Sequence, residues 1–200
     1  MPRPPKKTPV APTLNRESWV QAATNLLARE GLQAVAVEPL AQALGVTKGS
    51  FYWHFENRDD LIRAILEAWE QDQGADVATR YGGIPDPQRR LRVLLFAAFE
   101  DVENGKVLAA LTDASRDPRV APYLQRARQR SLALGLEALQ ALGLSEEEAR
   151  QRTLLAYTAY VGYFQLLRTA PDVVGAVPDL SGFVRHLADA LVPAHRHHHP

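Results

Sequence analysis

Apolar side chains recur every three or four positions along most of the chain, and no stretch alternates apolar and polar residues as a β-strand does. This periodicity predicts an all-α protein with about nine helices. The expected helices cover residues 16–30, 37–44, 47–54, 58 to the mid-seventies, 91–102, 107–111, 121–142, 146–168 and 180–192.

Capping residues and glycines set the expected ends of these helices. Asn15 and Asn57 can each accept a backbone N–H at a helix start, and Ser145 followed three residues later by Glu148 forms a capping box. Glycines 31 and 143 are expected to end two of the helices, because glycine readily adopts the backbone conformation found there.

The stretch "YGGIPDPQ", residues 81–88, cannot continue a helix, because two glycines and two prolines fall within it. A second helical region is expected beyond it. We place a helix-turn-helix domain at residues 14–60 and a larger helical domain at residues 61–192. Residues 1–13, rich in Pro and Lys, are expected to form a flexible basic arm, and residues 193–200 a His-rich tail.

The segment between Val37 and His54 has the features of a helix-turn-helix. Ala41 is small where two helices would cross closely, and Gly45 suits a turn residue with positive φ. Val46 and Phe51 supply apolar contacts that would fix the angle between the helices. The second helix is expected at about residues 47–54.

The second helix of this motif carries groups that bind nucleic acid. Its hydroxyl, ammonium and imidazole groups belong to Thr47, Lys48, Ser50, Tyr52 and His54. Such groups bind phosphates and base edges. Gly49 removes a side chain where the helix would approach DNA closely.

The aromatic residues of this segment are expected to divide between two faces. Phe51 and Phe55, four positions apart, should point into the core, whereas Tyr52 and Trp53 are free to lie against sugar and phosphate. The alternative is that the aromatic residues are core and that His54 is an ordinary polar residue.

Composition limits the classes of function. The 23 basic and 23 acidic residues balance, so a nucleic-acid surface must be local. The absence of cysteine excludes disulfides, thiol nucleophiles and Cys-based zinc sites. No nucleophile–base pair, carboxylate dyad or phosphate-binding glycine loop is recognised, so we predict neither an enzyme nor a cofactor. Because no apolar segment follows the basic start and none can span a bilayer, we expect a cytoplasmic protein without a membrane partner.

The stretch "AATNLLAREGLQAVAVEPLAQALGVTKGSFYWHFENRDDLIRAIL" resembles the DNA-binding domain of the tetracycline-repressor (TetR) family of bacterial transcriptional regulators. The resemblance implies that Thr47, Lys48, Ser50, Tyr52 and His54 match positions that touch DNA. It also implies that Arg58 meets a phosphate. Members often carry Thr-Thr, and sometimes a basic residue, at the start of the second helix, where this chain has Ala36, Val37 and Glu38.

The resemblance further implies a homodimer that places two such helices in successive major grooves of a pseudo-palindromic operator, about 34–36 Å apart. The dimer would form through helices at about residues 145–168 and 179–192. Apolar residues spread around the first of these more widely than one internal face needs: Tyr157, Tyr160, Val161, Phe164 and Leu167. The alternative is that this helix is central in its own monomer.

The resemblance also implies that a small, mostly apolar effector binds in the C-terminal region and releases a repressor from its operator. The candidate effector residues are Phe96, Phe99, Tyr123, Tyr157, Tyr160 and Phe164. Plain core packing explains each of them as well. A second alternative is that the C-terminal region binds another protein instead of a small molecule. Clustered histidines at 195 and 197–199 can bind Zn or Ni, but a polar tail or a cloning remnant also explains them, and we predict no metal site.

Overall fold

The computed structural model of the chain describes residues 14–74, 81 and 83–192. Within these ranges the regular structure is helical, which confirms the all-α prediction, with ten α-helices and one 3₁₀ helix against the nine helices expected. The elements are α1 (Arg16–Glu30), η1 (Leu32–Ala34), α2 (Val37–Ala43), α3 (Lys48–Phe51), α4 (Arg58–Gly74), α6 (Pro87–Glu100), α7 (Val102–Asp113), α8 (Ala121–Gln140), α9 (Glu146–Thr169), α10 (Pro171–Gly175) and α11 (Leu180–Leu191). The predicted arm at residues 1–13 and tail at residues 193–200 lie outside the described residues.

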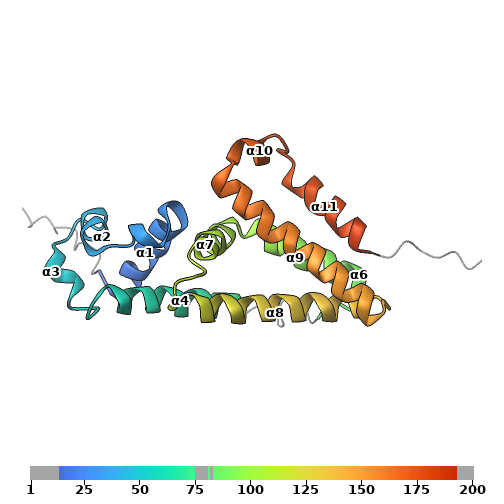
Figure 1. Cartoon of the computed structure of the whole chain (residues 1–200), viewed down its shortest axis with the longest axis horizontal. Helices are drawn as coiled ribbons and strands as arrows, with labels where there is room; N and C mark the ends of the chain where they lie inside the picture. The colour runs from blue at the N-terminus through green and yellow to red at the C-terminus, as the bar shows by residue number, and fades with distance from the viewer. Residues whose placement is uncertain (1–13, 75–80, 82, 193–200) are drawn as a thin grey trace, which may run out of the picture.

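Helices α1, α2 and α3 pack with the start of α4 at one end of the elongated molecule (Figure 1), and we call α1–α3 the N-terminal unit. Asn15 caps α1 by accepting a hydrogen bond from the backbone N–H of Ser18 at 2.9 Å, as predicted. Gly31, at φ +88°, ends the helix. Trp19 and Leu27 of α1 are fully buried in the core of this unit.

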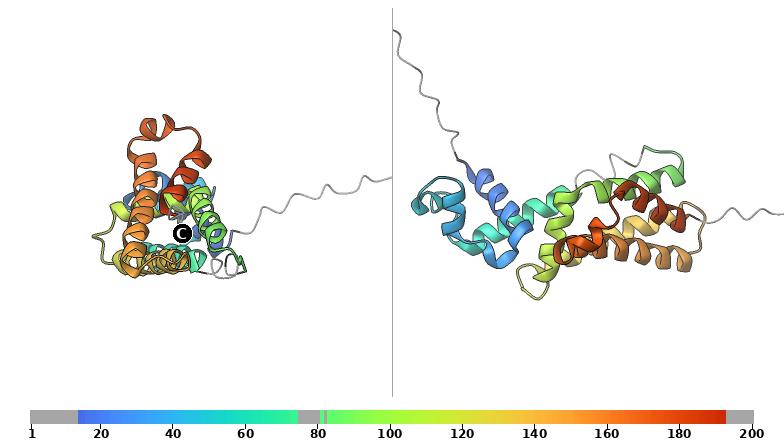
Figure 2. Two further views of the ribbon diagram at one scale, coloured as in Figure 1. Left: turned by 90° about the vertical axis from the view of Figure 1, so that its right-hand side faces the viewer. Right: turned by 90° about the horizontal axis from the view of Figure 1, so that it is seen from above.

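Helix α4 leads from the N-terminal unit towards the C-terminal helices, as the view from above in Figure 2 also shows. Its start is capped by Asn57, whose side chain accepts the backbone N–H of Asp60 at 3.0 Å. Farther along the helix, Glu70 accepts hydrogen bonds from Arg126 of α8 at 2.7 and 2.9 Å and from Arg130 at 3.2 Å. The same helix therefore contacts both parts of the molecule.

Helices α6–α9 and α11 form a C-terminal bundle with its own core. Phe99 of α6 and Phe164 of α9 are buried at its centre, with ring centroids 6.2 Å apart. Gly105 of α7 allows this packing, because a Cβ at that position would lie 2.3 Å from the ring of Phe164. Helix α9 begins at the predicted capping box, where Ser145 accepts the backbone N–H of Glu148 at 3.3 Å.

Several helix boundaries in this bundle differ from the prediction. Helix α6 begins at Pro87 instead of residue 91, and α8 ends at Gln140 instead of residue 142. Val102 was expected to end the helix that contains Phe99, but the chain breaks at Asp101 and Val102 begins α7. Asp101 causes this break, because its side chain accepts the backbone N–H of Asn104 at 3.2 Å and so caps a new helix. The short helix α10 was not predicted, although Pro171 suits its first position.

Candidate nucleic-acid interface

The turn between α2 and α3 has the geometry that a helix-turn-helix requires. Gly45 lies at φ +68°, a conformation that glycine adopts without strain. The backbone N–H of Val46 donates to the carbonyl of Ala41 at 3.0 Å, and Ala41 is only 5% exposed. These contacts fold α3 back against α2 and place its outer face in solvent.

The aromatic residues around α3 divide between core and surface as the sequence predicted. Phe51 is fully buried, with its ring edge-on to Trp19 at 5.3 Å and stacked on Phe55 at 5.3 Å. Tyr52 is 57% exposed and Trp53 is 88% exposed. Two large apolar rings therefore face solvent beside a helix that is anchored from its other side.

The structure brings most of the predicted DNA-contacting residues onto one continuous surface. Thr47, Lys48, Gly49, Tyr52 and Trp53 are exposed there, and Ser50 and His54 are partly buried. We call the segment 47–54 the α3 surface.

The helix within this surface is shorter than the predicted span of residues 47–54. It covers only Lys48–Phe51, because the following N–H groups turn back to carbonyls three residues earlier, such as His54 to Phe51 at 2.9 Å.

An acidic residue of α2 reaches the α3 surface. Glu38 forms an ion pair with the ammonium of Lys48, and both side chains are more than half exposed. The hydrogen bond from Lys48 lowers the pKa of Glu38, and the Glu38 carboxylate raises the pKa of Lys48. The cation predicted to meet a phosphate is therefore already paired within the chain.

Arg58 does not project into solvent as a phosphate-contacting residue would. Its guanidinium donates to the carbonyl of Val35 at 2.5 Å and to that of Leu32 at 2.8 Å. Leu32 opens η1 and Val35 follows its end, and the Leu32 carbonyl also accepts the backbone N–H of Val35 at 3.3 Å. In the single chain the Arg58 side chain joins the start of α4 to the segment before α2, and its contact with DNA stays a prediction.

A second arginine ties the start of α4 to the C-terminal bundle. Arg119, in the connection between α7 and α8, forms ion pairs with Asp117 and with Asp59 in the first turn of α4. Hydrogen bonds from Arg119 lower the pKa of Asp117 to about 2. No local sequence pattern predicts the contact with Asp59, because Arg119 lies 60 positions away from it in the chain.

The predicted effector residues do not form one group. Phe99, Tyr160 and Phe164 lie in one aromatic cluster, with Tyr160 edge-on to Phe164 at 5.2 Å. Phe96 is partly buried against the same core. Tyr123 instead packs against the core that α1–α4 share with α7 and the start of α8, beneath the guanidinium of Arg126, 4.6 Å from its ring centroid.

Tyrosine hydroxyls in the bundle are largely removed from water. Burial raises the pKa of Tyr160 strongly and that of Tyr157 to a smaller extent. The surroundings of these hydroxyls suit an apolar ligand better than an anionic one.

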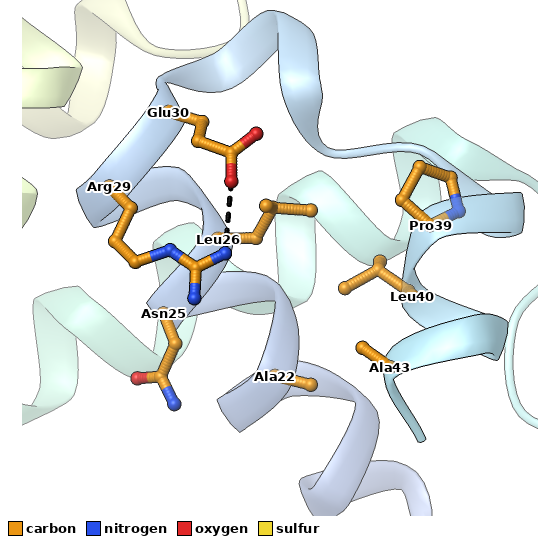
Figure 3. Close-up of a pocket in the computed structure, with 8 residues that line it drawn as sticks. All are labelled: Ala22, Asn25, Leu26, Arg29, Glu30, Pro39, Leu40 and Ala43. Atoms are coloured by element: carbon orange, nitrogen blue, oxygen red, sulfur yellow. Dashed lines mark hydrogen bonds and ion pairs between the residues drawn. The ribbon is translucent and has the colours of Figure 1, made fainter. Parts of the chain in front are cut away.

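A cleft of about 330 Å³ lies between α1 and α2 (Figure 3), away from the aromatic cluster. It is lined by Ala22, Asn25, Leu26, Arg29, Glu30, Pro39, Leu40 and Ala43. Arg29 and Glu30 pair at 2.9 Å across its rim. The cleft belongs to the N-terminal unit, so it does not support the predicted effector site in the C-terminal bundle.

The described part of the chain shows neither a metal site nor a membrane-spanning helix. No group of three or more acidic or histidine side chains there is placed to hold a metal ion. None of the helices described combines the length and apolar character that crossing a lipid bilayer requires.

Comparison with known proteins identifies the N-terminal part of the chain. The profile of the family described as "Bacterial regulatory proteins, tetR family" matches residues 20–65. The chain is 29% identical over 103 residues to the HTH-type transcriptional repressor KstR2 of Mycolicibacterium smegmatis, and 30% identical over 98 residues to the HTH-type transcriptional regulator AcrR of Shigella flexneri. Each alignment covers 48% of this chain, and 47% and 45% of the two relatives, so the chain matches about half the length of these curated relatives.

Solved structures match most of the chain. A TetR-family transcriptional regulator from Streptomyces coelicolor has a TM-score of 0.71 over 88% of this chain and 93% of its own, at 20% identity. The ketosteroid transcriptional regulator KstR2 of Mycobacterium tuberculosis has a TM-score of 0.68 over 92% of this chain and 100% of its own, at 17% identity. At these identities the likeness shows the fold. The relatives found by sequence are regulators of transcription. Residues 20–65 therefore match the tetR family of bacterial regulatory proteins, and most of the chain shares the fold of solved TetR-family regulators.

Proposed function

We propose that the chain is a homodimeric, sequence-specific DNA-binding regulator of transcription. The observation that carries the proposal is the α3 surface, which exposes Tyr52 and Trp53 while Phe51 anchors the helix from behind. A large exposed aromatic side chain loses little by leaving water and gains contact with sugar and bases. The match of residues 20–65 to the family profile supports the same function.

The residues of the α3 surface have different roles in this proposal. Thr47, Ser50, Tyr52 and His54 offer hydroxyl and imidazole groups that hydrogen-bond to phosphates and base edges. Lys48 would leave Glu38 to meet a phosphate. Arg58 is engaged with backbone carbonyls in the single chain, so a contact with DNA would require it to leave them.

Dimerisation is proposed through α9 and α11. Leu154 and Leu155, on α9, are 60% and 51% exposed in the single chain. Two adjacent exposed leucines on a long helix are typical of a surface that a partner covers. A two-fold axis along this face would place two α3 surfaces on one side of the assembly, about 34–36 Å apart for an operator with half-sites one turn apart.

The proposed regulation is release of a repressor by a small, mostly apolar effector in the cytoplasm. The aromatic cluster of Phe99, Tyr160 and Phe164 would suit an apolar ligand, since it consists of rings with the single hydroxyl of Tyr160. Only a ligand that binds two arrangements of the dimer with different affinity would change DNA binding.

A protein partner is kept as the second candidate regulator. Leu166 near the end of α9, and Val173 and Val177 in and after α10, are 43%, 50% and 54% exposed. These exposed residues lie at or beyond the C-terminal end of α9, away from Leu154. A partner of this kind would cover these residues without entering the aromatic cluster.

Selection of bound fragments from a random DNA pool tests the proposed function directly. We expect the full chain to enrich a pseudo-palindromic sequence, and Tyr52→Ala to lose most of that enrichment. Enrichment of unrelated sequences by the wild-type chain, at a level that Tyr52→Ala does not change, would contradict specific binding through α3.

Gly49→Ala provides a sharper test of where DNA lies. A Cβ at Gly49 would make only ordinary contact within the protein, 3.7 Å from Thr47 Oγ1. The variant should therefore melt at the wild-type temperature within a few degrees and yet bind the selected operator about tenfold more weakly, if DNA approaches this position closely. Wild-type affinity in a fluorescence anisotropy titration would place the DNA elsewhere.

A further inference from the structure

One arginine of α9 joins three elements that are distant in sequence. Arg168, in the last turn of α9, donates through Nε to the Asp113 carboxylate at the end of α7, at 2.8 Å. Through Nη1 it donates to the carbonyl of Ala28 at 3.0 Å and to that of Arg29 at 3.4 Å. Its side chain is only 20% exposed.

The end of α1 is built to receive this guanidinium. The last carbonyls of a helix lack partners within it and carry the negative end of the helix dipole, so a cation is favoured there. Gly31 follows at φ +88°, and a Cβ at this position would lie 3.0 Å from Arg168 Nη2. A side chain at Gly31 would therefore crowd the guanidinium as well as strain the backbone.

Asp113 is in turn fixed by two donors from α9. Gln165 Nε2 donates to its second carboxylate oxygen at 2.7 Å, and Arg168 occupies the first. Because Gln165 holds the Asp113 carboxylate in place, the carboxylate in turn holds the guanidinium of Arg168 in the orientation that reaches α1. We refer to Arg168, Asp113 and the Ala28 carbonyl as the α1–α9 junction.

We propose that Arg168 is a positioning residue that fixes the angle of the N-terminal unit relative to α9. The inference rests on the proposed function, in which α9 forms the dimer contact and α3 reads DNA. A shift of α9 or α7 in the bundle would then move α1, and with it the spacing of the two α3 surfaces. This route is separate from α4, which is tied to the bundle by Glu70 and by Asp59.

The remaining contacts of α1 should preserve the fold when Arg168 is replaced. Leu27 and Ala28 of α1 belong to the same core as Leu108 and Leu111 of α7. This apolar packing is not directional, whereas a guanidinium with three acceptors fixes an orientation. Loss of Arg168 should therefore loosen the angle of α1 more than it destabilises the chain.

Distance measurements between two spin labels test the proposal in the full chain. The native sequence has no cysteine. Cysteines can therefore be placed at exposed Gln42 on α2 and exposed Gln140 on α8, with labelled chains diluted in unlabelled ones. We expect a narrow distance distribution for the wild-type background and a clearly broader one for Arg168→Gln and Arg168→Lys, because an ammonium cannot span the same acceptors. Arg150→Gln is the matched control, since Arg150 pairs with Glu146 on its own helix, and it should leave the distribution unchanged.

A second readout concerns the operator. If Arg168→Gln reduces the fraction of molecules in the binding-competent orientation to between a tenth and a fifth, the affinity for a selected operator falls about five- to tenfold. Asp113→Asn keeps the shape of the acceptor, so it should broaden the distance distribution and weaken operator binding to a smaller extent. It replaces Arg168→Gln in the test if that variant unfolds at a much lower temperature. An unchanged distance distribution in both variants overturns the proposal. If the wild-type chain binds no DNA, the proposed function fails, but the distance distributions still decide whether the junction fixes the angle.

Discussion

At the surface proposed to contact DNA, the ammonium of Lys48 is paired with Glu38 of α2. A phosphate must therefore compete with a carboxylate of the same molecule. The negative charge would also stay close to the DNA backbone after Lys48 has left it. Glu38 thus opposes binding in two ways, by holding the cation and by repelling the phosphate.

Replacing Glu38 by Gln should raise the affinity for a selected operator about two- to fivefold at moderate salt. Lys48→Ala should reduce the slope of log K against log salt by about 0.9, the value for one lost phosphate contact. The loss from Lys48→Ala should be larger in the Glu38→Gln background than in the wild type, as measured by anisotropy titrations of all four proteins. Exposed Glu100→Gln, on α6, removes the same charge elsewhere and controls for the overall charge. Strict additivity of the two substitutions would show that the pair has no influence on binding.

The pair of Asp117 with Arg119 predicts a dependence of stability on pH. The pKa of the Asp117 carboxyl group in the folded chain is about 2, below the ordinary value of 3.8, because Arg119 stabilises the ionised carboxylate. The ionised form therefore stabilises the fold above about pH 4, and this contribution is lost as the pH falls through about 2. Asp117→Asn should lower the free energy of unfolding by about 2 kcal/mol at pH 7 and by about half as much at pH 3. Urea denaturation at the two pH values measures this difference, with exposed Asp72→Asn as the control; an equal loss at both would mean that charge is not the cause.

At the scale of the helices, close packing in the bundle depends on a missing side chain. Gly105 of α7 faces the ring of Phe164, and a Cβ there would overlap it at 2.3 Å. Phe164 is itself enclosed by Phe99, Tyr160 and Tyr163, so its ring has little room to move.

Gly105→Ala should therefore destabilise the chain by about 1–3 kcal/mol, although alanine is the better helix former. Thermal and urea denaturation measure the loss. Gly49→Ala, where a Cβ meets no close neighbour, is the matched control and should leave the unfolding midpoint almost unchanged. A more stable Gly105→Ala variant would mean that α7 and α9 can separate at low cost.

The helices that were correctly predicted have ends that depend on near neighbours in the sequence. Asn15, Asn57 and Ser145 each accept a backbone N–H three residues onward, a contact that residue type and spacing disclose. Phe51 and Phe55 were placed in the core by their spacing in the same way.

The features that could not be predicted from the sequence depend on contacts between residues that are distant in the chain. Arg58 resembles a phosphate-binding residue until the carbonyls of Leu32 and Val35 are seen beside it. Arg168 meets carbonyls in α1, 139 and 140 positions earlier, and no local pattern predicts such a partner. The effector residues were chosen as aromatic residues of the second region, but tertiary packing assigns Tyr123 to the other core.

At the scale of the whole molecule, the exposed leucines of α9 are the strongest support for a dimer. Leu154 and Leu155 follow the polar first turns of α9, whereas Phe164 farther along is buried in the bundle. An assembly through this face would leave the α3 surface of each chain free for DNA.

The double substitution of Leu154 and Leu155 by Glu should convert the dimer into a monomer, because four carboxylates would meet at the two-fold axis. Sedimentation velocity at micromolar concentration measures the change. Operator binding should fall by at least about a hundredfold, since a monomer contacts a single half-site. Arg150→Gln, one turn earlier and also exposed, is the control and should remain dimeric. If the leucine variant also remains a dimer, the dimer interface lies on another face of the chain.

The length of α4 has a mechanical consequence. Its 17 residues extend about 25 Å, so a tilt of only about 10° about the end that holds Glu70 would displace the opposite end by about 4 Å. If both protomers of the proposed dimer moved apart in this way, the distance between the two α3 surfaces would grow by about 8 Å from about 34–36 Å. At least one α3 surface would then leave its major groove. In the proposed dimer, a rod of this length would convert a rearrangement smaller than one side chain into complete loss of register with the double helix.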